Sequence, residues 1–97
     1  MIEQHNPMHP GEFIKRVYLI PCHIGSNELA RNLKVSDGLV SRLINGKTDV
    51  SPAMVLKLSK VLGRSPESWL QMQDNFNLHQ AKKELDLSEY EPLELAG

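Results

Sequence analysis

Signals that start and stop helices recur along this chain, and they constrain its fold more than any other feature. Two segments open with Ser-Pro, at residues 51–52 and 65–66, where serine can cap a helix and proline fits its first turn. We predict five helices. The first spans roughly residues 11–19, the second has about two turns after a cap at Gly25 or Ser26, and the third is capped by Ser36 and ends at Asn45 and Gly46. The last two span about 52–62 and 66–82. Pro21 is expected to end the first helix. Because no convincing strand pattern accompanies these helices, the sequence predicts an all-α fold of five helices.

The end of the chain differs in composition from the rest. From residue 84 it reads ELDLSEYEPLELAG, in which leucines alternate loosely with acidic residues. Such a segment has too little apolar surface to fold alone. We therefore expect one domain over residues 1–83 and an acidic tail over residues 84–97 that is extended or disordered. A short edge strand or a segment that docks on a partner is the alternative.

The charges of the chain are separated along its sequence, although the formal net charge is only −1. Residues 31–64 hold seven basic and two acidic residues, a net charge of +5. Residues 65–97 hold two basic and seven acidic residues, a net charge of −5. A basic centre favours binding of a polyanion, which would repel the acidic end. The alternative is that these charges are simply solvated.

Several function classes find no support in the sequence. No apolar run reaches the roughly 20 residues of a membrane-spanning helix, and we expect a cytoplasmic protein without a membrane partner. The single cysteine, Cys22, suits a reducing compartment, and with His23 it lacks a third catalytic group. His5 and His9 are separated by a proline and have no acidic cluster beside them, which argues against a metal site. We expect neither an enzyme nor a cofactor.

The stretch VSDGLVSRLINGK, residues 35–47, has the properties of a DNA-reading helix. It follows a short helix after a tight turn, as the second helix of a helix-turn-helix motif does, and that helix enters the major groove. Apolar residues at helical spacing would seat it on the domain. Asp37, Ser41 and Asn45, spaced by four residues, would face outward with Gly38 and Arg42, and Lys47 could reach a phosphate. Arg31 and Lys34 are further candidates for phosphate contacts.

Four stretches of the chain carry a family resemblance over residues 9–83: HPGEFIKRVYL, ELARNLKVSDGLVSRLINGK, SPAMVLKLSKVLG and SPESWLQMQDNFNL. Together they resemble the xenobiotic-response-element (lambda-repressor-like) helix-turn-helix proteins, and within these the HigA (VapI) antitoxins. The resemblance implies a dimeric DNA-binding antitoxin that neutralises a RelE-like ribonuclease toxin and represses its own operon. In a two-fold homodimer, each subunit would place its reading helix in successive major grooves of a palindromic operator.

The resemblance also implies roles for individual residues. The DNA-facing positions correspond to Ser36, Asp37, Gly38, Ser41 and Arg42, with Asn45 and Lys47 at the end of the helix. The apolar positions that lock the two helices together correspond to Leu29, Ala30, Val35, Val40 and Leu43. Members of the family commonly dimerise through their C-terminal helical region, which makes Trp69, Met72 and Phe76 candidate interface residues. Packing of Trp69 in the core is the alternative.

Two other functions stay open at this point. The chain would be a free-standing transcriptional regulator if it had no toxin partner. It would be an interaction protein if its acidic tail and N-terminal arm bound a basic partner and the motif were only a scaffold. Asp37, which would repel phosphates, and Gly38, which lacks a side chain, motivate the second possibility.

Overall fold

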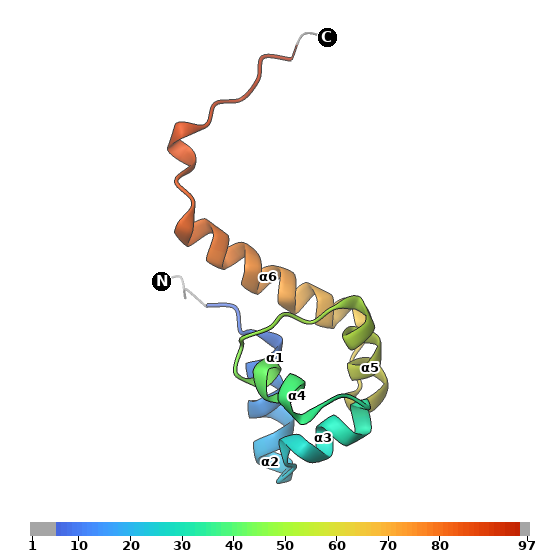
Figure 1. Ribbon diagram of the computed structural model, residues 1–97. Helices are drawn as coiled ribbons and strands as arrows, with labels where there is room; N and C mark the ends of the chain where they lie inside the picture. The colour runs from blue at the N-terminus through green and yellow to red at the C-terminus, as the bar shows by residue number, and fades with distance from the viewer. Residues whose placement is uncertain (1–5, 96–97) are drawn as a thin grey trace, which may run out of the picture.

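The computed structural model describes residues 6–95, and within this range it contains helices and no strand (Figure 1). Its elements are α1 (Pro10–Ile14), η1 (Lys15–Leu19), α2 (Ile20–Cys22), α3 (Ser26–Leu33), α4 (Asp37–Ile44), α5 (Pro52–Leu62), α6 (Pro66–Glu84) and the short 3-10 turn η2 (Leu87–Glu89). The first three follow one another without a break and form one helical segment. With that segment counted once, the predicted all-α fold of five helices is confirmed.

The prediction that Pro21 ends the first helix is wrong. The helix continues through the π-helical segment η1 to Cys22. In a regular α-helix, proline lacks the amide hydrogen and its ring collides with the carbonyl four residues earlier. In the π segment the hydrogen bonds span five residues, as between the Ile20 N–H and the Lys15 carbonyl, and this wider turn accommodates the proline ring. The segment ends at His23, which has a φ of 56°.

Serine caps begin three of the helices, as predicted. The side-chain oxygens of Ser36, Ser51 and Ser65 each accept a hydrogen bond, 3.1 Å long, from the N–H three residues further along the chain. These bonds satisfy amides that have no partner inside the helix. α3 begins after Gly25 without a side-chain cap, and Gly63 follows α5 with a φ of 94°.

The helices enclose one hydrophobic core, and Trp69 of α6 is its largest fully buried side chain. The buried apolar residues are Ile14, Leu19, Leu29, Ala30, Leu33, Val40, Leu43, Val50, Met54, Val55, Leu58 and Trp69. The indole N–H of Trp69 donates a 3.0 Å hydrogen bond to the carbonyl of Gly63, so this buried donor is satisfied. α6 is thereby anchored at its first turn to the end of α5.

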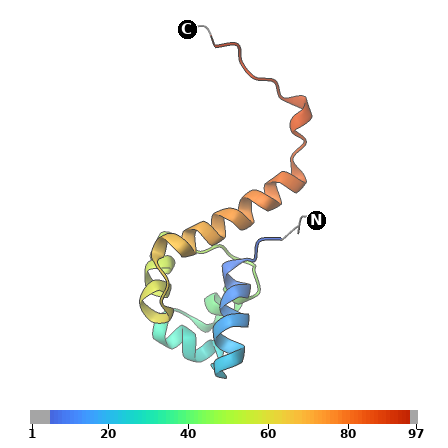
Figure 2. The same ribbon diagram turned by 180° about the vertical axis from the view of Figure 1, so that it is seen from behind.

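α6 lies across the helical body, and the chain after it leads away from that body (Figures 1 and 2). Residues 85–95 are extended except for η2, and all of their side chains are exposed. Asp86 caps η2, where hydrogen bonds from the Ser88 hydroxyl (2.7 Å) and the Ser88 N–H (3.0 Å) lower the pKa of its carboxyl. None of the helices in the described range is long and apolar enough to cross a membrane.

Candidate nucleic-acid interface

α3 and α4 form the predicted helix-turn-helix. Leu29 and Ala30 of α3 are buried with Val40 and Leu43 of α4, and Val35 of the connecting turn packs against them. The turn is tight because Lys34 takes a left-handed conformation, with a φ of 59°, and the Val35 N–H then bonds to the Ala30 carbonyl at 3.0 Å. The apolar residues assigned to the joint between the two helices therefore lie in the core or pack against it.

The residues predicted to face DNA form one continuous exposed run from the cap of α4 to the loop that follows it. All seven are exposed: Ser36, Asp37, Gly38, Ser41, Arg42, Asn45 and Lys47. At the end of the helix, the Asn45 side-chain amide donates to the Ser41 carbonyl at 2.8 Å, and the Lys47 backbone N–H bonds to the Arg42 carbonyl at 2.8 Å. The loop is thus tied to the helix, and it holds Lys47 at the edge of the same run.

The guanidinium of Arg42 lies back along α4 over Gly38. A Cβ added to Gly38 would be 3.5 Å from Nη1 of Arg42, which is ordinary van der Waals contact. Helical side chains commonly lean toward the N-terminus in this way. The positive charge is therefore carried toward the first turn of α4, which is the end that approaches base edges in this motif.

The C-terminal end of α4 is positioned by direct backbone contact with α1. A Cβ added to Gly11 would overlap the Leu43 carbonyl group and would lie 3.0 Å from Cα of Ile44. Since these are backbone atoms, no side-chain movement can make room. Only glycine therefore allows α1 to approach this closely.

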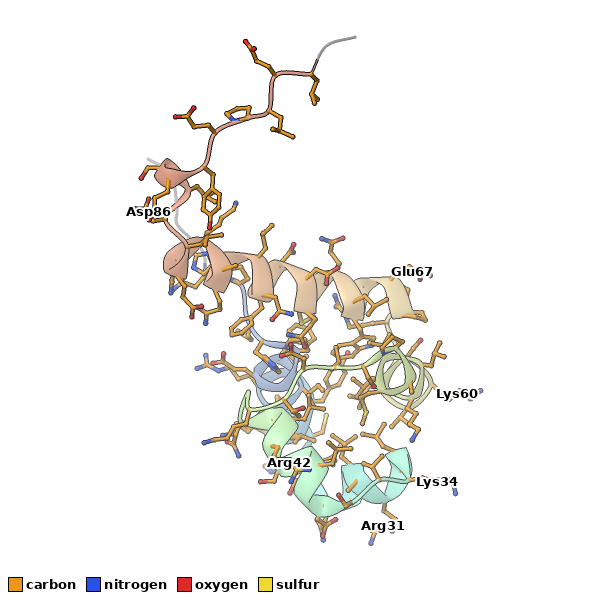
Figure 3. All side chains as sticks on the ribbon, turned by 45° about the horizontal axis from the view of Figure 1, so that its top comes forward. Arg31, Lys34, Arg42, Lys60, Glu67 and Asp86 are labelled. Carbon is orange, nitrogen blue, oxygen red and sulfur yellow. The ribbon has the colours of Figure 1, made fainter. Side chains whose placement is uncertain are left out.

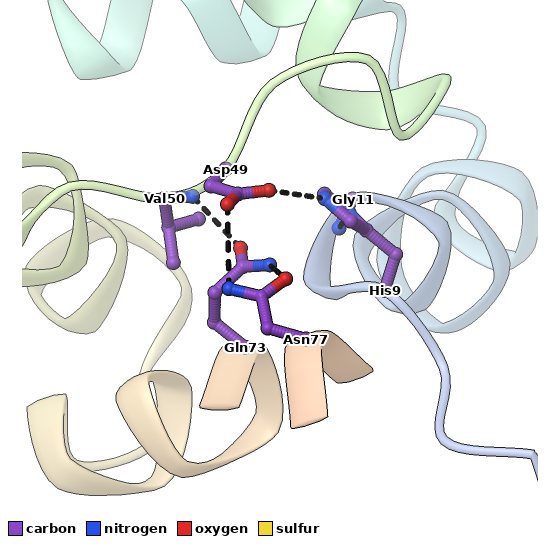
Figure 4. Close-up of polar contacts among 6 residues, drawn as sticks. All are labelled: His9, Gly11, Asp49, Val50, Gln73 and Asn77. Atoms are coloured by element: carbon purple, nitrogen blue, oxygen red, sulfur yellow. Dashed lines mark hydrogen bonds and ion pairs between the residues drawn. The ribbon is translucent and has the colours of Figure 1, made fainter. Parts of the chain in front are cut away.

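A polar network joins the segment after α4 to the middle of α6 (Figure 4). Oε1 of Gln73, a side chain only 4% exposed, accepts from the Val50 N–H at 2.8 Å. Nε2 of Gln73 donates to Asn77 at 3.1 Å, and the Asn77 amide donates to Asp49 at 3.3 Å. Asp49 and Val50, which follow the loop after α4, are thereby held by one face of α6.

His9 completes this network from the N-terminal side. It is buried and caps α1, because its Nδ1 accepts from the Gly11 N–H at 2.9 Å. That bond leaves the proton of the neutral ring on Nε2, which faces Asp49 at 3.6 Å. Its ring also meets Phe76 edge-on, with 5.0 Å between the ring centroids. His9 is thus part of the fold, whereas His5 lies outside the described residues.

This network was not predicted from the sequence, although a signal for Gln73 was present. Trp69, Gln73 and Asn77 are spaced by four residues and therefore share one face of a helix. A tryptophan on the core face implies that the glutamine beside it is also covered. A covered amide needs partners, and the loop after α4 supplies them.

The three candidate interface residues differ in exposure. Trp69 is fully buried, as expected from the alternative in which it packs in the core. In this packing its side chain is not accessible to a second copy of the chain. Met72 and Phe76 are half-buried on α6. Of the three, only these two have side-chain surface accessible to another chain.

The basic residues of segment 31–64 do not form one surface. Arg42 and Lys47 lie on or after α4, whereas Lys34, Lys57 and Lys60 line a groove between α3 and α5. Figure 3 shows Lys34 and Lys60 at one edge of the helical body and Arg42 away from them. The guanidinium of Arg64 lies over the Phe13 ring at 4.9 Å and the Trp69 ring at 5.7 Å. Only some of the basic residues that give segment 31–64 its net charge of +5 therefore lie close to α4.

Comparison with known sequences places the motif in a family. The HTH_3 helix-turn-helix profile matches residues 26–69. The uncharacterised HTH-type transcriptional regulator YddM of Escherichia coli is 36% identical over 83 residues, which cover 86% of this chain and 87% of that protein. The antitoxin HigA-1 of Vibrio cholerae is 37% identical over 75 residues, which cover 77% of this chain and 70% of that antitoxin.

Solved structures show the same arrangement. The antitoxin HigA of Pseudomonas aeruginosa, solved with the higBA promoter, superposes with a TM-score of 0.79 at 30% identity and covers 90% of this chain and 98% of its own. A similarity that extends over nearly the whole of that chain includes α6 as well as the helix-turn-helix.

Proposed function

Since this chain belongs to the helix-turn-helix family of the xenobiotic-response-element type, in the HigA antitoxin branch, we propose that it represses its own operon and neutralises a RelE-like ribonuclease toxin. The proposal has a DNA part and a toxin part. They rest on different features of the chain and are tested separately.

The exposed run on α4 is the observation that carries the DNA part. Arg42 offers two parallel N–H donors that match O6 and N7 of guanine in the major groove. The hydroxyls of Ser36 and Ser41 can donate to or accept from base edges or phosphates, and Asp37 can accept from a cytosine amine. Lys47, which is exposed directly after α4, would contact a phosphate in the proposed complex.

The support beneath α4 favours DNA reading over a scaffold role. Base recognition needs side chains held within a fraction of an ångström of their productive geometry. The Gly11 contact fixes the end of α4, and the bond from Val50 to Gln73 fixes the loop that follows. A polar face that served only solubility would need neither restraint.

A homodimer on a palindromic operator follows from the size of the reading helix. α4 has eight residues and is about 12 Å long, so one copy contacts only a few base pairs. Two copies related by a two-fold axis would place their α4 helices about 34–36 Å apart in successive major grooves. We propose that Met72 and Phe76 contribute to the interface. Both lie in α6, which follows the helix-turn-helix in the sequence. Monomers at micromolar concentration on and off DNA would contradict this arrangement.

The toxin part draws on the named antitoxin relatives and on charge. A small ribonuclease needs positive charge to hold RNA, and residues 65–97 carry a net charge of −5. An adjoining reading frame for a small basic protein, and co-purification of its product with this chain, would support neutralisation. If neither were found, the chain would be a free-standing regulator.

The DNA part is tested by fluorescence anisotropy of the purified protein on a duplex from its own promoter and on a shuffled duplex. We expect salt-sensitive binding that prefers the promoter and falls about 5- to 150-fold in Arg42→Ala, since a bidentate contact to guanine is worth about 1–3 kcal/mol. Arg16→Ala is the matched control, because Arg16 is an exposed arginine of η1 that pairs with Glu12 at 2.9 Å. Equal, weak binding to both duplexes, unchanged by Arg42→Ala, would contradict DNA reading.

A further inference from the structure

An apolar groove with a basic rim lies between α3 and α5, apart from the DNA-facing run. Its volume is about 390 Å³, and Leu33, Leu56 and Val61 supply its apolar lining. Lys34, Lys57 and Lys60 are exposed around it. Leu56, in the middle of α5, is 63% exposed, whereas Val55 and Leu58 of the same helix are buried. The groove thus pairs an apolar floor with three positive charges.

The tail has the complementary chemistry. Leu85, Leu87, Leu93 and Leu95 are between 52% and 86% exposed, and acidic residues alternate with them. In an extended chain, alternate side chains point to opposite sides. A tail segment such as residues 93–95 therefore presents leucines to one side and a carboxylate to the other.

From this match we propose that the groove between α3 and α5 binds the acidic, leucine-containing tail of a second copy of the chain. Tail leucines cover Leu56 and the apolar floor. The lysines extend their apolar stems along the walls of the groove and place their ammonium groups near the tail carboxylates. The interaction joins two copies at a surface distinct from α4.

The length of α6 favours a second copy over the same chain. α6 has 19 residues and is about 28 Å long, and it leads away from α5 across the body (Figure 1). Residues 85–95 span at most about 40 Å when fully extended. A tail that returned to its own α5 would use most of this length on the way, and few leucines would remain to fill the groove.

The floor of the groove also favours a leucine-containing segment over a nucleic-acid backbone. Phosphates would pair with the lysines but would leave Leu56 and Val61 facing a charged, hydrated ligand. A tail leucine instead removes apolar surface from water on both partners. DNA contact by these lysines is therefore the competing outcome of the test.

The test is disulfide cross-linking between two full-length variants in a Cys22→Ser background, since Cys22 is an exposed thiol. One variant carries Leu56→Cys and the other Leu93→Cys, both at exposed positions where the substitution leaves the core intact. We expect the mixture to form the mixed disulfide faster than a mixture of Leu93→Cys with Ile20→Cys. Ile20, 60% exposed on α2, is the matched control away from the groove.

Charge reversal checks the role of the rim. Adding Lys57→Glu and Lys60→Glu to the Leu56→Cys chain should slow the cross-link about tenfold at low salt and much less at high salt. A rate no faster than the Ile20→Cys control would overturn the proposal. So would a disulfide confined within single chains when one chain carries both Leu56→Cys and Leu93→Cys.

A third result would also overturn it: charge reversal that weakens promoter binding without slowing the cross-link would assign these lysines to DNA. Because the cross-link is measured without DNA or toxin, its failure is distinguishable from failure of the proposed function.

Discussion

Gly11 of α1 lies against the backbone carbonyl of Leu43, the last buried residue of α4, with no room for a side chain between the two helices. This contact links the N-terminal helix directly to the end of α4, the helix proposed to read DNA. The geometry of the candidate interface therefore depends on a residue 25 positions before the exposed run begins.

Gly11→Ala should lower the free energy of unfolding by about 3 kcal/mol, because backbone atoms occupy the space that the methyl group needs. Gly38→Ala is the matched control: its Cβ meets only the end of the Arg42 side chain, so it should raise that free energy by about 0.5–1 kcal/mol. Urea denaturation of both variants measures the difference. Equal effects of the two substitutions would contradict the contact with Leu43.

Gln73→Leu should destabilise the protein by about 1–3 kcal/mol, because the Val50 N–H would be left without its acceptor in a buried site. Promoter affinity should fall as well, since the loop after α4 loses its tie to α6. Gln71→Leu serves as the control. Gln71 is an exposed glutamine of the same helix that bonds only to the exposed Asn75, and its replacement should change stability by less than about 0.5 kcal/mol. Thermal unfolding and anisotropy together report both effects.

Ser36→Ala and Ser65→Ala should each cost about 1 kcal/mol of stability, because each removes a cap that accepts a 3.1 Å hydrogen bond. Only Ser36→Ala should lower promoter affinity beyond this loss, since Ser36 lies at the end of α4 that is proposed to approach DNA. The comparison is made at a temperature where both variants are fully folded. A matching loss of affinity in Ser65→Ala would mean that the effect is one of stability.

The salt dependence of promoter binding distinguishes lysines that contact DNA phosphates from lysines that lie elsewhere on the surface. In a plot of log affinity against log salt concentration, Lys47→Ala should reduce the slope by about one, the change expected for one lost phosphate contact. Lys60→Ala removes the same charge at the groove between α3 and α5 and should leave the slope unchanged. Titrations of the promoter duplex at several salt concentrations provide the slopes. An unaltered slope in Lys47→Ala would remove this residue from the proposed contacts.

Local signals in the sequence predict where most helices begin and end, and which face of residues 36–47 is exposed. Serine caps, first-turn prolines and glycine stops act over three or four residues, so their effect can be inferred without knowing the rest of the fold. The spacing of apolar residues that predicts the packing of α3 against α4 can also be recognised without knowing the rest of the fold. The exposed run on α4 follows directly from that spacing.

Features that depend on residues far apart in the chain follow from the packing of the helices and not from local signals. The bond between Val50 and Gln73 joins positions 23 residues apart, and the close approach at Gly11 requires α1 and α4 to cross at one point. Pro21 stays inside a helix through a change in hydrogen-bond spacing that propensity does not predict. The +5 segment is divided between α4 and the groove beside α5, because helix packing distributes charges that lie close together in sequence to different surfaces.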